Sequence, residues 1–373
     1  MIEEDLGIKP VINCTGTLTL LGGNIVEEEV VDAMKEAARS FFDMQELHRK
    51  AGEFVAKLLG AEAAYIVNGA EAGLVLSLAS CLTRGDIEKM VSLPDLGGEV
   101  IVQKLHRNLY DYIIRFTGAK VVEIGGKGGT TRRDLESAIN EHTVASVYFA
   151  YDPQDGVLPL EQVSEICRSR GVPVIADAAA ELPPKENFTR FLSRGADLVL
   201  FSGGKDIGAP NDTGLVIGRK DLIEGCRILG PQSYIKYKGE SHIFIGRPLK
   251  TSKEDVFAFV AALKKYLSTN DETRASNWEK TADFFIERFK RVAKVRKIYG
   301  GPRQPRPTIV PKVEIELPVG GINADDFVKE LRAGDPPIAA YAVEGKLYLN
   351  VQCLKDGDEK IVAERMLQLL DAT

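Results

Sequence analysis

Short apolar segments alternate with longer helical patterns through the first two thirds of the chain. Between residues 64 and 219 the apolar segments include AYIVNG, EVIVQK, PVIADAAA, DLVLFSGG and TGLVIGR, and helical patterns such as EAGLVLSLASCLT run between them. A chain that alternates strands and helices in this way favours a parallel sheet covered by helices. The pattern therefore predicts an α/β fold with a mostly parallel central sheet.

The last third of the chain has a different pattern. Residues 220–250 bring Gly, Pro, Tyr and Lys in quick succession, and we interpret them as one long functional connection. Two helical patterns, two strand patterns and a terminal helix follow, at 253–267, near Trp278, at 308–317 and from 346 onward. We therefore expect an N-terminal segment and a large domain in residues 1–250, and a small C-terminal α+β domain in residues 251–373.

The composition and charge are typical of a globular protein and disfavour one class of function, broad binding to nucleic acid. The chain has 373 residues, of which 44% are hydrophobic and 27% are charged, and this balance is typical of globular proteins. Lys and Arg total 48 against 54 Asp and Glu, which gives a formal net charge of −6. No long basic block interrupts the mixture, so the sequence disfavours broad binding to nucleic acid.

The cysteines and the amino terminus indicate the cellular compartment in which the protein is expected. The five cysteines are scattered and form no C-x-x-C pair, which favours a reducing compartment over a disulfide scaffold or a zinc site. His48, His142 and His242 show no metal-like pairing, so we expect no metal centre. No targeting segment is evident, and the apolar runs are far shorter than the roughly 20 residues that span a bilayer. We therefore expect a cytoplasmic protein without a membrane partner.

Lys205 follows an apolar run in the segment 197-DLVLFSGGKDIGAP-210. Residues 197–201 have the pattern of a strand that is buried on both faces, and Lys205 comes just past its carboxyl end. Ligands bind at that edge in open α/β sheets, and a desolvated lysine can lose its proton and attack a carbonyl. A lysine on a solvated turn fits the same segment, so both interpretations stay open at this point.

Asp177 interrupts a second buried-strand pattern, 173-PVIADAAAELPP-184. An unpaired carboxylate is costly in such a place, so Asp177 needs a partner. Pyridoxal phosphate would satisfy both Asp177 and Lys205, because its aldehyde forms a Schiff base with a lysine and a carboxylate keeps its ring nitrogen protonated. The alternative is that Asp177 caps a helix or a turn.

Other groups could complete a site for this cofactor. A strand pattern ends at Asn68-Gly69-Ala70 and a helix follows, so backbone N–H groups and the helix dipole could receive a phosphate. Ser202 can add a hydroxyl donor. His106 follows the EVIVQK strand pattern, where it could stack on the ring and assist proton transfer. A structural histidine and an ordinary strand-to-helix turn would fit the same residues.

Several segments together resemble the selenocysteine-synthase-like family of fold-type-I pyridoxal phosphate enzymes. These segments are VINCTG, LGAEAAYIVNGAEAGL, ADAAAELPP, FSGGKDIGAPNDTGLVIGRKDLI and IGRPLKTSKED. The resemblance runs from about residue 9 to the end of the 253–267 helix, with a weaker match beyond it. The DAAAELPP and SGGK segments are more similar to the D-glucosaminate-6-phosphate ammonia-lyase branch than to selenocysteine synthase itself.

The resemblance implies a role for each residue of the candidate site. It implies a Schiff base at Lys205, Asp177 at the pyridinium nitrogen and His106 against the ring. It also implies that the cofactor phosphate contacts four residues, namely Gly69, Ala70, Glu71 and Ser202. The resemblance further implies at least a homodimer, because fold-type-I sites usually lie between subunits.

Arg247 and Lys250 resemble a pair of basic residues that the family carries three positions apart. In selenocysteine synthases both members of this pair are arginines, and they serve a neighbouring subunit's site. Lysine at position 250 departs from that pattern and cannot offer a bidentate fork. Whether the pair binds the cofactor phosphate or a substrate anion therefore stays open, and a solvated Lys250 is a further alternative.

The expected reaction is an α,β-elimination of the ammonia-lyase or dehydratase type. Lys205 would remove the α proton of a hydroxylated amino acid or amino-sugar acid, with or without a phosphate group, and would protonate its leaving group. One alternative is a selenocysteine synthase-like transferase on seryl-tRNA, which the acidic net charge and the early VINCTG segment disfavour. A second alternative is an aminotransferase. A third is a catalytically silent binding protein, and the presence of Lys205 and Asp177 argues against it.

Overall fold

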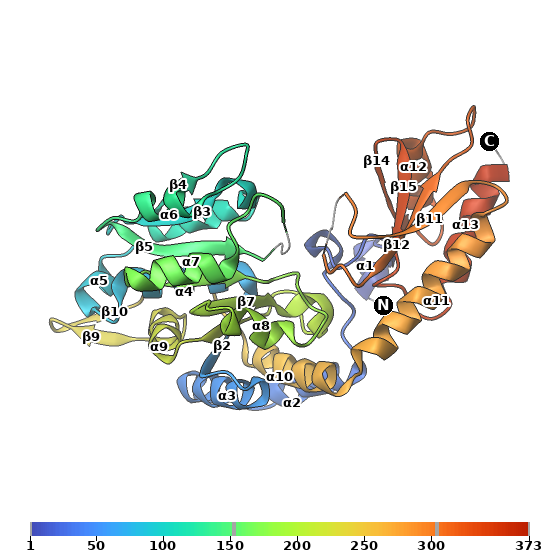
Figure 1. Cartoon of the computed structure of the whole chain (residues 1–373). Helices are drawn as coiled ribbons and strands as arrows, with labels where there is room; N and C mark the ends of the chain where they lie inside the picture. The colour runs from blue at the N-terminus through green and yellow to red at the C-terminus, as the bar shows by residue number, and fades with distance from the viewer. Residues whose placement is uncertain (1, 151–153, 303–305, 372–373) are drawn as a thin grey trace. The chain divides into compact units, whose positions relative to one another are not determined.

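The computed structural model describes residues 2–150, 154–302 and 306–371, and the chain divides into two compact units (Figure 1). The larger unit is Val26–Tyr266, and the smaller unit joins the residues up to Ile25 to those from Leu267 onward. This division differs from the boundary expected after residue 250. Helix α10 (Lys253–Ser268) belongs almost wholly to the larger unit, because its Phe257 ring packs 5.1 Å from the Phe42 ring.

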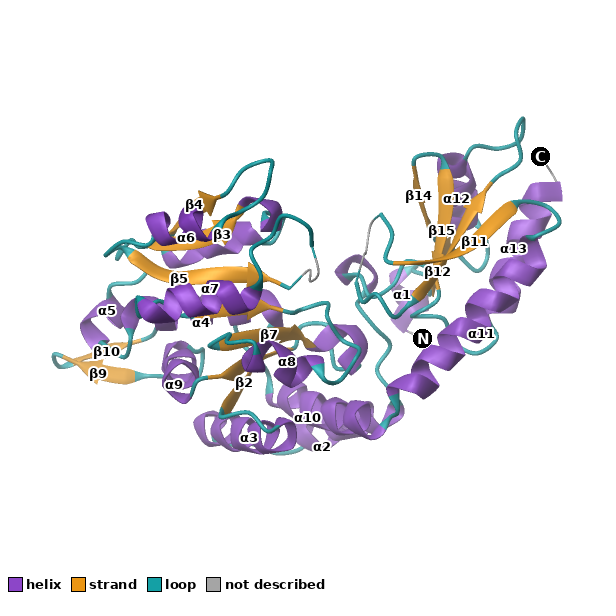
Figure 2. Cartoon of the chain, viewed as in Figure 1, coloured by secondary structure: helices purple, strands orange, loops and turns teal. Residues whose placement is uncertain are grey.

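A seven-stranded sheet forms the centre of the larger unit (Figure 2). Its strands, in the order β2-β8-β7-β6-β5-β3-β4, are β2 (Ala63–Val67), β8 (Gly214–Gly218), β7 (Leu198–Ser202), β6 (Val174–Asp177), β5 (Thr143–Phe149), β3 (Glu99–Gln103) and β4 (Lys120–Ile124). Neighbouring strands are parallel except that β8 runs antiparallel to both β2 and β7. The expectation of a mostly parallel sheet is therefore confirmed, with one reversed strand that the sequence pattern did not predict.

Helices cover both faces of this sheet. The α-helices of the larger unit besides α10 are α2 (Glu28–Ala38), α3 (Met44–Leu59), α4 (Gly69–Thr83), α5 (Ile87–Val91), α6 (Arg132–Ala138), α7 (Leu160–Ser169), α8 (Asn187–Ser193) and α9 (Lys220–Leu229). Short helical turns are η2 (Lys104–His106), η3 (Asp111–Thr117) and η4 (Gly203–Ile207). Helix α4 crosses β5 to β8 and packs along α9, whereas the Phe188 ring of α8 lies 4.9 Å from the ring of Phe201 on β7.

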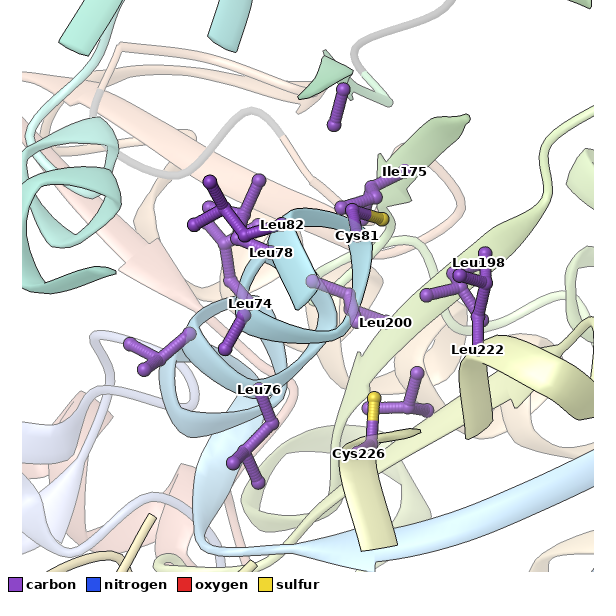
Figure 3. Close-up of a cluster of buried hydrophobic side chains, with 14 of the residues drawn as sticks. Leu74, Leu76, Leu78, Cys81, Leu82, Ile175, Leu198, Leu200, Leu222 and Cys226 are labelled. Atoms are coloured by element: carbon purple, nitrogen blue, oxygen red, sulfur yellow. The ribbon is translucent and has the colours of Figure 1, made fainter. Parts of the chain in front are cut away.

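The core of the larger unit lies between α4, α9 and the sheet (Figure 3). Leu198 and Leu200 alternate with residues of the opposite face of β7, and both belong to the cluster that includes Leu74 and Leu78 of α4. Nearly every residue of α4 is buried, which explains why its sequence is apolar all round. A Cβ at Gly73 would lie 3.0 Å from Cγ2 of Val216, so glycine allows the helix to approach the sheet closely.

Residues 220–250 correct one expectation from the sequence. We interpreted them as one long connection, but they contain helix α9 and a hairpin of β9 (Ile235–Tyr237) and β10 (Glu240–His242). The helix forms because Leu222, Cys226 and Leu229 recur at helical spacing and are buried against α4. The density of Gly, Pro, Tyr and Lys around the hairpin concealed this periodicity.

The smaller unit has the α+β character expected of the carboxyl-terminal part. Its antiparallel sheet follows the order β11 (Lys294–Tyr299), β12 (Pro311–Glu316), β15 (Lys346–Asn350), β14 (Tyr341–Val343). Helices α11 (Asp271–Phe289), α12 (Ala324–Ala333) and α13 (Asp358–Asp371) pack with it, and α1 (Ile2–Leu6) and η1 (Thr19–Leu21) lie in its amino-terminal segment. That segment joins the unit because β1 (Ile12–Asn13) pairs in parallel with β13 (Ile338–Ala339). Among the described residues, no helix is both long enough and apolar enough to cross a membrane.

Candidate active site

One edge of the large sheet gathers the segments that carry the candidate residues. The parallel strands β3, β5, β6 and β7 all end at this edge. Strand β2 ends there and β8 begins there, because Val67, Gly214 and Ser202 are in register across the three strands. The structure therefore brings to one edge the segments that carry His106, Asp177, Ser202, Lys205 and the turn at Gly69.

Lys205 lies in η4, directly past β7, and is partly buried. Its backbone dihedrals of φ −102° and ψ −128° are not helical, so the chain bends at this residue. Burial lowers the pKa of the Lys205 amine, and the charges of Asp177, Glu181 and Glu71 raise it in part. No side chain in the described ranges forms an ion pair or hydrogen bond with this amine. Burial therefore favours the neutral, nucleophilic form of this amine.

Asp177 is the last residue of β6 and pairs with Phe149 of β5 and Leu200 of β7. Its Oδ1 accepts a hydrogen bond from the Ala179 backbone N–H at 3.0 Å. Burial raises the pKa of Asp177, while this hydrogen bond and the Lys205 charge lower it. Asp177 thus braces a turn, as one interpretation expected, and its carboxyl group also lies within electrostatic reach of the lysine.

The predicted phosphate turn begins α4. Asn68, at the N-cap position, makes no side-chain cap, and its amide nitrogen donates instead to the Lys250 carbonyl at 3.0 Å. The first-turn N–H groups of α4 are therefore not satisfied by the cap residue. Gly69 has φ +75°, and a Cβ built there would meet no heavy atom within 4 Å, so open space adjoins the start of the helix. Backbone donors, the helix dipole and open space together fit an anion.

Gly214 holds β8 close to this turn. A Cβ at Gly214 would lie 2.5 Å from the carbonyl carbon of Gly69 and 2.8 Å from the nitrogen of Ala70. Any side chain there would displace the start of α4. Sequence reasoning missed Gly214, because nothing in TGLVIGR distinguishes its first glycine from one at an ordinary strand end.

His106 is the last residue of η2 and is buried. Its ring meets the ring of Tyr148 edge-on at 4.6 Å, and the ring of Phe149 lies 6.5 Å away. The following residue, Arg107, forms ion pairs with Asp111 and with Glu123, which fix the segment after His106. His106 is therefore held at the β3 and β5 ends, next to the strand pair that carries Phe149 and Asp177.

Arg247 and Lys250 have different surroundings. The Arg247 Nη1 donates to the Pro231 carbonyl at 3.4 Å, and its guanidinium lies 5.8 Å from the centre of the Tyr234 ring. The Lys250 side chain is exposed, although its carbonyl accepts the hydrogen bond from Asn68 at the start of α4. The contacts of Arg247 thus lie on the segment before β9, apart from those of Lys205 and Asp177.

The sequence analysis did not predict that the carboxylates of Glu181 and Glu71 act on the charge of Lys205. Glu181, four residues after Asp177 in AAAELPP, is only 7% exposed, and its charge acts on Lys205. Glu71 was predicted as a phosphate contact of the turn, but its carboxylate also acts on this lysine. Burial and the charge of Asp177 raise the pKa of Glu71, and Lys205 lowers it. We call Lys205, Asp177, Glu181 and Glu71 the Lys205 cluster.

Comparisons with known proteins cover almost the whole chain. The model of the family described as L-seryl-tRNA selenium transferase matches residues 11–271. D-glucosaminate-6-phosphate ammonia lyase from Salmonella typhimurium is 32% identical over 380 residues, which cover 100% of this chain and 96% of that protein. 5'-C-glycyluridine monooxygenase-decarboxylase from a Streptomyces species is 31% identical over 385 residues, with 99% and 92% covered.

The structural comparison agrees with these likenesses. The solved structure of D-glucosaminate-6-phosphate ammonia-lyase matches with a TM-score of 0.83 at 29% sequence identity, and the match covers 100% of this chain and 98% of that one. Further structural matches at about 15% identity are aminotransferases and a cysteine desulfurase, which show the shared fold.

The edge fits a phosphorylated aldehyde such as pyridoxal phosphate. An aldehyde needs an amine that can lose its proton, and burial lowers the pKa of the partly buried Lys205. A ring nitrogen that carries a proton needs a carboxylate, and Asp177 lies within reach of the same lysine. A phosphate needs donors and room, which the uncapped first turn of α4 supplies beside Gly69.

Proposed function

The chain belongs to the L-seryl-tRNA selenium transferase family, and from this premise we propose that it is a lyase that eliminates ammonia from a hydroxylated amino-sugar acid or amino acid. The likenesses confirm the family, its ammonia-lyase branch, the fold-type-I class and the dependence on pyridoxal phosphate that the sequence predicted. The relative whose name states an ammonia-lyase reaction on D-glucosaminate 6-phosphate aligns with the whole chain. That alignment supports an amino-sugar acid as the substrate class.

One observation supports this function above the others. A partly buried lysine lies past a central strand, with a pKa lowered by burial and with an acidic residue on the neighbouring strand. When bound, pyridoxal phosphate supplies an aldehyde that takes up an amine and a ring that withdraws electrons from the adjacent carbon. Lys205 would hold the aldehyde, and Asp177 would face the ring nitrogen.

The other predicted residues would hold the remaining parts of the cofactor. The N–H groups of Gly69, Ala70 and Glu71 would donate to the phosphate, and Ser202, at the end of β7, would add its hydroxyl. His106 would lie against the ring, because the aromatic residues of β5 hold it at the same edge.

Lys205 would then carry the proton through the reaction. In its neutral form, the Lys205 amine would take the proton from the α carbon of the substrate. The ammonium that results can give a proton to the hydroxyl on the β carbon, which leaves as water. Hydrolysis then yields ammonia and a keto acid, so Lys205 serves as both base and acid.

The reaction is tested by trapping and by product analysis. Borohydride reduction of the protein with pyridoxal phosphate should label Lys205, and mapping the label to another lysine would remove this proposal. The holoenzyme should release ammonia and a keto acid in equal amounts from an amino-sugar acid such as D-glucosaminate 6-phosphate. Its unphosphorylated form and a simple β-hydroxy amino acid complete the panel.

Other products would identify another reaction. An amino group retained on the cofactor without ammonia would indicate an aminotransferase. Oxygen uptake with release of carbon dioxide would resemble the activity that the Streptomyces relative is named for. Selenium transfer to seryl-tRNA would match the family's name. Any of these outcomes, without ammonia from the panel, would contradict the lyase.

We also propose that the protein is a homo-oligomer in which Arg247 and Lys250 serve a ligand anion in another subunit's site. The contacts of Arg247 lie apart from the Lys205 cluster, which supports a role outside its own subunit's site. Light scattering would give the oligomeric state. Mixing refolded Lys205→Ala and Arg247→Ala subunits should restore part of the activity, whereas an active monomer would contradict this arrangement.

A further inference from the structure

The carboxamide of Gln154 is only half used by the fold. Its Nε2 donates to the Leu105 carbonyl at 3.3 Å, whereas its Oε1 is buried and accepts no hydrogen bond from any residue that the structure describes. We infer that Gln154 binds the substrate, because its Oε1 accepts a hydrogen bond from a hydroxyl group that the substrate keeps through the reaction. The inference rests on the proposed function and narrows its substrate class to polyhydroxylated amino acids.

The chain around Gln154 lies at the edge that carries the candidate active site. The Ala150 N–H, just past β5, donates to the Asp177 carbonyl at 2.9 Å. Farther along, Gln154 contacts Leu105, which directly precedes His106 in η2. The Gln154 carboxamide therefore lies beside η2, at the ends of β3 and β5, among the segments that carry the predicted cofactor residues.

Contacts on both sides hold this segment in place. The Gln103 side chain, at the end of β3, accepts from the Leu158 N–H at 2.7 Å and donates to the Leu158 carbonyl at 3.0 Å. The Gly156 carbonyl accepts from the Thr130 N–H at 2.8 Å, and a Cβ at Gly156 would lie 3.0 Å from Cδ1 of Leu105. The segment thus packs directly on η2 and β3, so its buried oxygen belongs to a built surface and not to a solvated loop.

The Leu105 carbonyl decides which atom of the Gln154 carboxamide is left for a ligand. A carbonyl can only accept, so the amide nitrogen must face it. The amide oxygen accepts and never donates, so the partner that it lacks is an O–H or N–H group. A buried acceptor without a donor is costly, which is why such atoms in folded proteins usually mark a ligand or a water.

A substrate hydroxyl fits this acceptor better than the other donors do. The proton on the ring nitrogen of the cofactor would face Asp177, and an ammonium group would favour carboxylates over a neutral carboxamide. The β hydroxyl needs a proton donor before it leaves as water, so the partner is a hydroxyl farther from the α carbon. A site that is built to bind a hydroxyl discriminates against an analogue without it, because the acceptor is then left unpaired.

Calorimetric binding to the full-length protein loaded with pyridoxal phosphate tests this inference. D-gluconate 6-phosphate carries a hydroxyl where the proposed substrate carries its amine, so it binds without reacting. The second ligand is its analogue that lacks the two hydroxyls nearest to the phosphate. The wild type should bind D-gluconate 6-phosphate more tightly than the analogue. Gln154→Met should reduce this ratio of Kd values about 3-fold to 10-fold, since one neutral hydrogen bond is lost.

Gln154→Glu separates binding of the hydroxyl from support of η2. Both Gln154→Met and Gln154→Glu lose the donor to Leu105, but only Gln154→Met loses the acceptor. The two ligands carry the same charge, so the charge that Gln154→Glu adds affects both and cancels in the ratio. Gln154→Glu should therefore keep the wild-type ratio. Gln162→Met is the matched control, because it makes the same change at an exposed glutamine of α7, and it should also keep the ratio.

Each outcome decides the role of Gln154. Equal binding of the two ligands by the wild type, or a wild-type ratio in folded Gln154→Met, would overturn the inference. Loss of the ratio in both Gln154→Met and Gln154→Glu would leave Gln154 as a support of η2 alone and would also overturn it. If circular dichroism shows that Gln154→Met is unfolded, Gln154→Ala takes its place and the same ratio decides. The measurement needs no turnover, so expected ratios without ammonia from the substrate panel would contradict the lyase and keep the hydroxyl site.

Discussion

Replacement of Gly214 by alanine tests how the sheet edge holds the predicted phosphate turn. Gly214 begins β8 and lies in register with Val67 and Ser202 of the adjoining strands. A Cβ there would lie 2.5 Å from the carbonyl carbon of Gly69, whereas ordinary contacts begin near 3.4 Å. The start of α4 would therefore have to move by about 0.9 Å, because the obstacle is backbone and not a flexible side chain.

This displacement sets the size of two effects. Forcing one extra carbon into a packed site costs about 1–3 kcal/mol, so the free energy of unfolding of the apoprotein should fall by about that amount. The displaced N–H groups would also lose a hydrogen bond to the cofactor phosphate, and such charge-assisted bonds contribute about 1.5–3 kcal/mol. We expect the Kd for pyridoxal phosphate to rise about 10-fold to 100-fold.

Urea unfolding of the apoprotein and absorbance titration with pyridoxal phosphate measure these effects. Gly128→Ala is the control, because a Cβ at Gly128 would meet no heavy atom within 4 Å. A Gly214→Ala protein that matches this control in both measurements would refute the close approach of β8 to α4. Reduced stability with unchanged cofactor affinity would place the phosphate away from the start of α4.

Three further substitutions test the charges of the two units. Asp177→Asn should lower the turnover rate about 10-fold to 100-fold, because a charge-assisted hydrogen bond to the cofactor is lost. The Asp177→Asn apoprotein should equal or exceed the wild type in urea stability at about pH 8. Burial raises the pKa of Asp177, so its ionisation weakens the folded state. Glu314→Gln should lower the free energy of unfolding by about 1–2 kcal/mol at about pH 7, because hydrogen bonds from Arg296, Lys346 and Tyr348 hold the pKa of Glu314 at about 2. In urea unfolding, this difference from the wild type should shrink as the pH falls from about 4.5 toward about 2. A difference that stays constant over this range would contradict the prediction. Burial lowers the pKa of Lys312 to about 8, so wild-type urea stability should rise between about pH 8 and about pH 10.5, and Lys312→Met should lack this rise.

The sequence could predict the sheet edge because its information there is local. A run of apolar residues locates a strand, and the first polar residue with reactive chemistry after it locates the edge. Lys205 and Asp177 both follow this rule, and so does the turn at Gly69. Because parallel strands end at the same edge of a sheet, these positions can be placed together even when the strand order is not known.

The remaining features depend on contacts between segments that are distant in the chain. The reversed direction of β8 and the close approach of Gly214 to Gly69 follow from pairing with β2, which local pattern does not specify. The amino-terminal segment joins the smaller unit only through the pairing of β1 with β13. Glu181 resembles an ordinary turn residue in sequence, and its burial becomes evident only when Phe188 is seen to pack on β7.

The arrangement of charge along the edge favours one orientation of an amphoteric ligand. At the β2 and β8 end, the first turn of α4 presents N–H groups and the positive end of a helix dipole, which attract a phosphate. At the β6 and β7 end, the charges of Asp177 and Glu181 favour a protonated nitrogen. A ligand with a phosphate at one end and a basic nitrogen at the other is stabilised in one direction and opposed in the reverse direction. The edge therefore orients its ligand before any covalent bond to Lys205 is made.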